Sequence, residues 1–165
     1  YDVNFRASHK NGGLKVTPNL HDNLEMADIV RGSSEDFEIL FRQHDADTVY
    51  RSQIAFYTKK FIYTRSADPV EVRGDSGFSK QYPVLPTETV STIGAGDNFN
   101  AGFIYGLIKN GITRQHIDQG LTESQWDALV SSALDFSAEC CRDIYNYVSE
   151  KYGEKMRKGL QNNGL

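Results

Sequence analysis

A short run of small residues followed by one carboxylate is the part of the sequence best suited to chemistry. The run is Gly94-Ala95-Gly96, and Asp97 follows it directly. Glycines let backbone N–H groups approach a ligand, and a helix beginning here adds partial positive charge, so the turn could hold an anion. Asp97 could then take the proton of a hydroxyl that attacks a phosphoryl group. The residues alone leave open a second interpretation, an ordinary helix start with an acidic first turn.

Two better-known glycine-rich motifs do not fit this turn. A Walker A loop requires Gly-x-x-x-x-Gly-Lys-Ser/Thr, and no stretch of the chain has that pattern. A dinucleotide fingerprint requires Gly-x-Gly-x-x-Gly, but Phe99 occupies the third glycine position. If this turn binds phosphate, it therefore does so as neither of these two motifs.

The turn needs a strand before it and a helix after it, and the sequence pattern predicts both. Residues 88–92 are a candidate strand, and a helix is expected from about Asp97 to Lys109, before Asn110-Gly111. Strands that alternate with helices favour an α/β layered domain with a largely parallel sheet, in which ligands bind at the carboxyl ends of strands. The other expected strands are 28–31, 60–64, 70–73 and 78–83, and the other expected helices are 17–26 (beginning at Thr17-Pro18), 34–42, and one from the capping box Thr122–Gln125 through Val148.

Composition limits the remaining classes of protein. The chain has 165 residues with 18 Lys+Arg and 22 Asp+Glu, which gives a formal net charge of −4. This mild acidity lacks the basic excess typical of nucleic-acid-binding surfaces. No apolar run approaches the roughly 20 residues of a membrane span. We therefore expect neither a nucleic acid nor a membrane as partner.

The cysteines and histidines do not suggest a second site. Cys140 and Cys141 are adjacent and cannot close a useful loop, so a disulfide framework is excluded. They fall on the apolar face of the last long predicted helix, which favours a core role over a redox role. The four histidines are far apart and lack metal-ligand spacing. The absence of a disulfide framework fits a reducing compartment, and we expect a cytoplasmic protein.

The segment from Thr92 to Phe103 closely resembles the carboxy-terminal signature of ribokinase-like carbohydrate kinases, the phosphofructokinase B family. It reads Thr92-x-Gly94-Ala95-Gly96-Asp97-x-Phe99, followed by Ala101-Gly102-Phe103. Weaker matches occur in the family's order: 2–6 is similar to an Asp-x-Asn-x-Arg strand end, 27–32 to the strand before an Asn-x-x-Glu motif, and 61–68 to a strand and turn that hold nucleotide. The resemblance covers most of the chain and implies a three-layer α/β/α Rossmann-like ribokinase fold.

The resemblance also implies an activity, with ATP and Mg²⁺ as cofactors. This is ATP-dependent phosphorylation of a hydroxyl of a sugar or sugar acid, as in fructokinase-like or ketodeoxygluconate-kinase-like members. Asp97 matches the family's general base, and the Gly94, Ala95 and Gly96 amides match its anion hole. The resemblance further assigns Thr64, Ser66, Ser33 and Gly96 to the nucleotide, 136–141 to the border of the adenine pocket, and Arg6 with Asp97 to the substrate.

The sequence departs from the family pattern at several positions. Ser33 and Asp36 stand where the family has Asn-x-x-Glu, so they either form a capping pair for the following helix or organise Mg²⁺ through water, with Asp36 as the metal-side residue. Ser66 and Pro69 replace usual glycines, which implies a stiffer nucleotide loop. Ser91 and Ile93 replace an Asp and a Thr of a monovalent-cation site, and losing the carboxylate argues against potassium activation.

These departures keep two other interpretations open besides the kinase. One is a non-catalytic member of the family that binds nucleotide or sugar, and the other is an α/β domain whose turn is only structural; the retained Asp97 favours the kinase. The chain begins at Tyr1, in what resembles a mid-protein strand, and family members are roughly twice as long. We therefore expect 1–165 to be the nucleotide-binding and catalytic part of a single ribokinase-like domain, inactive alone, with a frayed tail at 160–165. The sugar-binding half and a lid, through which a homodimer could form, would lie outside it.

Overall fold

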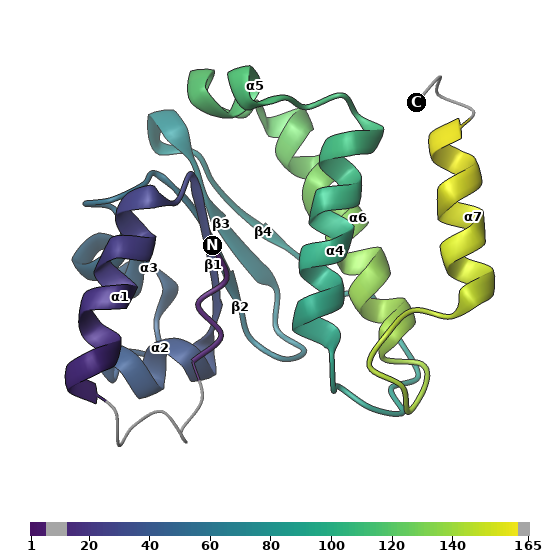
Figure 1. Ribbon diagram of the computed structural model, residues 1–165, viewed down its shortest axis with the longest axis horizontal. Coiled ribbons are helices and arrows are strands. Elements are labelled where there is room, and N and C mark those ends of the chain that lie inside the picture. Colours follow the sequence, from purple (N-terminus) through teal and green to yellow (C-terminus); the bar gives the residue numbers. More distant parts are fainter. Residues whose placement is uncertain (6–12, 162–165) are drawn as a thin grey trace. The chain divides into compact units, whose positions relative to one another are not determined.

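The computed structural model describes residues 1–5 and 13–161, with the backbone alone described at 13–18 (Figure 1). The chain divides into two compact units, Tyr1–Val84 and Leu85–Leu165, and each is described by itself. Among the residues that the structure describes, none of the helices is both long enough and apolar enough to cross a membrane. Of the expected frayed tail, only 160–161 is described, as the end of the last helix.

The first unit is built on a four-stranded sheet with the strand order β1-β2-β3-β4. Strands β1 and β2 are parallel, and Ser33 at the end of one lies opposite Thr64 at the end of the other. Strands β2, β3 and β4 are antiparallel neighbours. The described sheet is thus mixed rather than largely parallel, because short connections reverse the chain on both sides of β3, whereas a parallel crossover needs about a dozen residues or more. The strands are β1 Ile29–Ser33, β2 Lys60–Thr64, β3 Val70–Arg73 and β4 Ser79–Tyr82.

Aromatic packing holds the helices of the first unit on one face of the sheet. Phe37 is fully buried and stacks on Tyr63 with ring centroids 5.7 Å apart. It also meets Phe61 edge-on at 5.5 Å. Gly32 makes room for this ring, since a Cβ there would lie 2.5 Å from the Phe37 Cζ. The helices are α1 Gly13–Met26, α2 Ser34–Phe41, α3 Ala46–Val49, the π-helix η2 Tyr50–Ile54 and the 3₁₀ turn η3 Asp75–Gly77.

The start of the first helix differs from the sequence-based expectation. Helix α1 begins at Gly13, four residues before Thr17, so Pro18 lies inside the helix instead of at its first position. A proline lacks the backbone N–H and removes one helical hydrogen bond. Burial of Leu20 and Leu24 in the core of the first unit offsets that loss.

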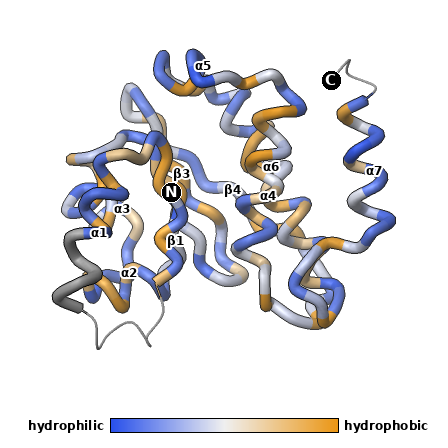
Figure 2. The backbone as a smooth tube through the Cα atoms, in the orientation of Figure 1, coloured by the Kyte–Doolittle hydropathy of each residue, from blue (hydrophilic) through white to orange (hydrophobic). Residues whose placement is uncertain are grey.

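The second unit is helical, and two of its helices pack closely through glycines. A Cβ at Gly102 would lie 2.5 Å from the Ser132 carbonyl oxygen, and a Cβ at Gly106 would lie 3.2 Å from the Leu129 Cα. The absence of side chains at these two positions therefore sets how closely α4 and α6 approach. Helix α7 is mostly hydrophilic along its length (Figure 2) and has no fully buried residue. The helices are α4 Ala95–Lys109, α5 Arg114–Gln119, α6 Glu123–Cys140 and α7 Glu150–Gln161.

Two expectations for the second unit are wrong. Residues 88–92 do not form a strand, because the Val90 and Ser91 N–H groups donate to the Cys141 carbonyl at 2.8 and 3.3 Å, taking the place of strand partners. Helix α6 ends at Cys140 instead of continuing to Val148. The chain turns there, and Ile144 is 68% exposed rather than part of the core. The capping box at Thr122–Gln125 is confirmed as the start of α6.

Candidate active site

The glycine-rich turn forms the N-terminus of α4. Gly94 is the capping residue and has a φ of +82°, a left-handed conformation that favours glycine. The Ala95 N–H, one of the three amides expected in the anion hole, instead donates to the Thr92 carbonyl at 3.2 Å, which closes the turn. The next two N–H groups, of Gly96 and Asp97, have no acceptor among the described residues, as is usual in the first turn of a helix. Two aligned donors at the positive end of a 15-residue helix suit an anion.

Asp97 stands on the exposed side of this first turn. Its side chain is solvent-accessible and takes part in no hydrogen bond or ion pair within the described ranges. A carboxylate that other groups do not occupy can accept a proton from a substrate hydroxyl. The position next to the two donors therefore combines a base and an anion site within one helical turn.

A buried polar cluster lies behind the turn. Its centre is Asn98, which is only 8% exposed and whose amide nitrogen lies 2.9 Å from the Gly94 carbonyl oxygen. The Cys140 sulfur is 3.2 Å from the same nitrogen and 3.6 Å from the Ile93 carbonyl oxygen. Burial, with the nearby charges of Cys141 and Asp97, raises the pKa of the Cys140 thiol, so the thiol stays protonated at neutral pH. The predicted core role is confirmed for Cys140 by its complete burial, whereas Cys141 is only half-buried.

The nucleotide-side candidates lie in the first unit, where β1 and β2 end. Ser33 caps α2, and Asp36 closes a capping box: its Oδ2 accepts hydrogen bonds from the Ser33 N–H at 2.7 Å and the Ser33 hydroxyl at 2.6 Å. The Phe5 N–H donates to Asp36 Oδ1 at 2.6 Å. Both carboxylate oxygens thus already have donors, which favours the capping role over the metal role. In the part of the chain that is described, no three or more His, Cys, Asp or Glu side chains gather to hold a metal ion.

Arg31, which the sequence analysis did not single out, connects Thr64 at the end of β2 to Asp2 near the start of the chain. The Arg31 guanidinium donates to Thr64 Oγ1 at 2.9 Å and pairs with Asp2 Oδ1 at 3.0 Å. The guanidinium is held in place from both sides and is 14% exposed. The sequence signal that could have identified Arg31 is its charge at the third position of β1, a strand whose other residues are uncharged. Its charge is balanced by Asp2, so what Arg31 provides at this edge is a fixed position for the Thr64 hydroxyl.

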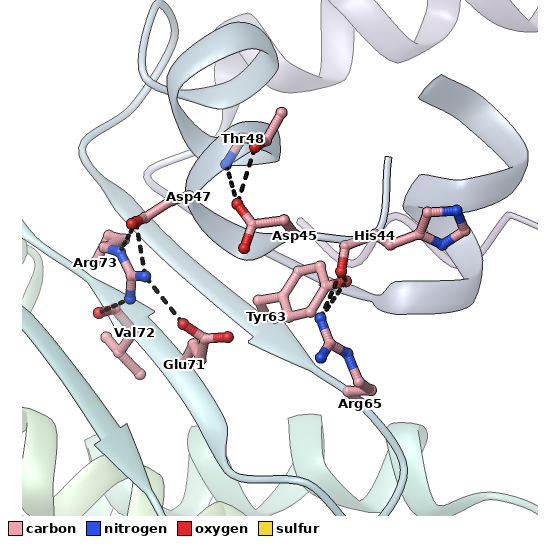
Figure 3. A network of polar contacts seen from close by, with 9 residues as sticks. All are labelled: His44, Asp45, Asp47, Thr48, Tyr63, Arg65, Glu71, Val72 and Arg73. Atoms are coloured by element: carbon pink, nitrogen blue, oxygen red, sulfur yellow. Dashed lines mark hydrogen bonds and ion pairs between the residues drawn. The ribbon is translucent and has the colours of Figure 1, made fainter. Parts of the chain in front are cut away.

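The turn after β2 is tied down by a second network (Figure 3). The Arg65 guanidinium donates to the His44 carbonyl oxygen, and the Tyr63 hydroxyl donates to the same oxygen at 2.9 Å. Arg65 also lies over the Tyr63 ring, 5.4 Å from its centroid. Ser66 follows with a φ of +38°, in the region that favours glycine. A glycine adopts this left-handed backbone conformation easily, whereas Ser66 adopts it at some cost in strain.

The structure brings the predicted residues together within each unit. Ser33, Asp36 and Thr64 share one edge of the first unit, with Ser66 two residues beyond β2. The second unit holds the sequence from Gly94 to Asp97. Arg6, the expected substrate residue, lies outside the described residues.

The two roles left open for Ser33 can be separated by Ser33→Ala. We expect this variant to lose about 1 kcal/mol of stability because the Asp36 N–H loses its capping acceptor. Faster amide hydrogen exchange in α2 would report the loss. If Ser33 acts only as a cap, ATP affinity measured by calorimetry stays unchanged; a weaker affinity at equal folded fraction would assign Ser33 to the nucleotide.

Comparisons with known proteins identify the family of the chain. Residues 1–136 match the profile of the pfkB family carbohydrate kinases. A 5-dehydro-2-deoxygluconokinase of Geobacillus kaustophilus is 23% identical over 141 residues, covering 82% of this chain and 40% of that protein. A fructokinase of Rhizobium leguminosarum bv. trifolii is 32% identical over 112 residues, covering 66% of this chain and 30% of that protein.

The fold is also that of solved kinases. The aminoimidazole riboside kinase of Salmonella enterica, solved with aminoimidazole riboside and an ATP analog, superposes with a TM-score of 0.74 at 18% identity. The match covers 96% of this chain and 50% of that one, so the chain spans half the length of this kinase. This confirms the expected ribokinase-like α/β fold, with a described sheet that is mixed instead of largely parallel. Because the family profile matches most of its length, the chain belongs to the pfkB family of carbohydrate kinases.

Proposed function

We propose that this chain carries the catalytic base and the anion-binding turn of an ATP-dependent kinase that phosphorylates a hydroxyl of a sugar or sugar acid. The observation that carries the proposal is the first turn of α4. There the exposed carboxylate of Asp97 lies beside two N–H donors, that of Gly96 and its own, which have no acceptor within the described residues. Membership of the pfkB family and the sugar-kinase relatives support the substrate class.

The reaction needs few protein groups. As the substrate oxygen attacks the γ-phosphorus of ATP, its proton passes to the Asp97 carboxylate, and the bond between that phosphorus and the ADP oxygen breaks. The N–H groups of Gly96 and Asp97 stabilise the negative charge on the phosphoryl oxygens as it moves. Gly94 and Ala95 shape the turn that presents these donors. A positioned base contributes about 10²–10⁴-fold, and one lost donor of this kind costs roughly 3–4 kcal/mol.

On the nucleotide side, we assign Thr64, Ser66 and Ser33 to the border of the ATP phosphates or ribose. Arg31 supports this assignment because it fixes the Thr64 hydroxyl at the end of β2. ATP enters kinases as its Mg²⁺ complex, and Mg²⁺ keeps most of its oxygen ligands from phosphates and water. The described residues offer no dedicated metal cluster, and the Asp36 oxygens already accept hydrogen bonds. A Mg²⁺ ion held mainly by the nucleotide fits this chain best.

The proposal is tested on the protein encoded by the complete open reading frame that contains this chain. ADP release is measured with ATP and Mg²⁺ against a panel that includes 5-dehydro-2-deoxygluconate, fructose and aminoimidazole riboside. We expect saturable ADP release with at least one sugar or sugar acid, and a phosphorylated product by mass spectrometry. Tight ATP binding by calorimetry without turnover on any acceptor would favour the non-catalytic alternative instead.

A further inference from the structure

Asn98, the residue that follows the proposed base, faces three acceptors at once. Its amide nitrogen lies 2.9 Å from the Gly94 carbonyl oxygen and 3.0 Å from the Asn146 carbonyl oxygen. The Cys140 sulfur is the third acceptor, at 3.2 Å. Because both carbonyl oxygens are acceptors only, the amide must present its NH₂ group to this cluster. An aspartate or an apolar side chain could not make these bonds.

The three contacts join segments that are distant in sequence. Gly94 begins the turn, Cys140 ends α6, and Asn146 lies in the loop between α6 and α7. The same loop presses on the turn from behind, since a Cβ at Gly94 would lie 2.6 Å from the Asn146 carbonyl oxygen. Asn98 therefore ties the turn to the backbone of the loop between α6 and α7, a contact that hydrogen bonds within α4 cannot provide.

We propose that Asn98 is a positioning residue that sets the direction of the Gly96 and Asp97 N–H donors, an inference that rests on the proposed kinase function. Gly94 adopts a left-handed conformation with no side-chain cap of its own. Its carbonyl accepts the helical hydrogen bond from the Asn98 backbone N–H at 2.9 Å, and the Asn98 side-chain amide adds a second hydrogen bond that also ties the turn to the Asn146 carbonyl. Once that amide is lost, the turn can rotate about Gly94, and the two donors no longer aim at one point. A shift of about 1 Å in such a site costs on the order of 10²-fold in rate.

The experiment compares two variants at Asn98 with a matched control at the other end of the same helix. Asn98→Ala removes all three bonds. Asn98→Ser keeps a hydroxyl that can reach the Gly94 carbonyl, four residues back, but not Asn146. The control is Asn110→Ala, because the Asn110 amide also donates to a carbonyl four residues back, that of Gly106, at 2.8 Å.

In the protein from the complete reading frame, Asn98→Ala should lower kcat by about 10- to 100-fold with little change in KM for the sugar. Asn98→Ser should fall between Asn98→Ala and the unchanged protein. Asn110→Ala should lose stability but keep its kcat. If Asn98→Ala keeps its kcat, or if Asn110→Ala loses as much kcat at equal folded fraction, the positioning role is overturned while the kinase proposal stands.

A binding measurement judges Asn98 even if the protein transfers no phosphate. ATP is titrated into the isotope-labelled protein from the complete reading frame, and the backbone amide signals of Gly96 and Asp97 are followed by NMR. We expect both signals to shift in the unchanged chain and in Asn110→Ala, and to respond weakly in Asn98→Ala. Equal responses in all three chains, or no response in the unchanged chain, would overturn the inference.

Discussion

Asp97→Asn, made in the protein from the complete reading frame, is expected to lower kcat by about 10²–10⁴-fold while ATP still binds. Asparagine keeps the size of the side chain and its place in the first turn of α4, but its amide cannot accept the hydroxyl proton at neutral pH. The helix N-terminus loses a favourable charge worth only about 0.3–1 kcal/mol, so folding should survive. ADP release with the best acceptor of the panel measures the effect.

Asp118→Asn is the matched control for charge. Asp118 is also an exposed carboxylate of the second unit, and it pairs with Arg114 at 2.7 Å on α5. Exposed pairs of this kind contribute little to stability, so this variant should keep the kcat of the unchanged protein. An Asp97→Asn protein that turns over as fast as Asp118→Asn would show that Asp97 is not the base.

Gly94→Ala is expected to damage both folding and catalysis. The left-handed φ of +82° costs an alanine about 1–2 kcal/mol, and its Cβ would lie 2.6 Å from the Asn146 carbonyl oxygen. Relief requires the turn or the loop behind it to move, so the total loss should reach about 2–4 kcal/mol, with a lower kcat as the donors shift. Urea unfolding followed by Trp126 fluorescence measures the second unit directly, because the chain has one tryptophan and it is fully buried there.

Gly111→Ala separates the two causes of that loss. Gly111 also has a positive φ, of +60°, but a Cβ there would meet nothing within 4 Å. It should therefore lose only the backbone cost of about 1–2 kcal/mol and keep its kcat. Equal losses of stability in the two variants would mean that the loop around Asn146 yields freely and does not hold the turn.

Local signals explain most of what the sequence predicted correctly. The capping boxes at Ser33 and Thr122 need only residues three positions apart, and both are present. The strands at 60–64 and 70–73 have short runs of strand-forming residues, and both are observed with these bounds. The helix after the glycine-rich turn needs only its periodicity and its end signal, and it is observed two residues longer at its start.

The errors have a common physical origin in partners that are distant along the chain. Residues 88–92 have the composition of a strand, but a strand forms only where another strand accepts its N–H groups, and here the Cys141 carbonyl takes two of them. The apolar spacing after Cys140 continued the helical pattern, yet the chain turns there and reaches Asn98 instead. Periodicity reports which residues can share a face, not whether the backbone continues.

The sequence by itself identified the family, because the signature from Thr92 to Phe103 is one continuous segment, and it predicted the chemistry that we propose for the turn and Asp97. Only the tertiary structure decided how that turn is held: the Asn98 amide, the Cys140 thiol and the Asn146 carbonyl come together across 48 residues of chain. It also decided that Asp36 Oδ2 closes the cap while Oδ1 accepts from the Phe5 N–H, and that Arg31 holds Thr64. Hydrogen-bond partners distant in sequence leave no local pattern, so they become visible only when the chain is folded.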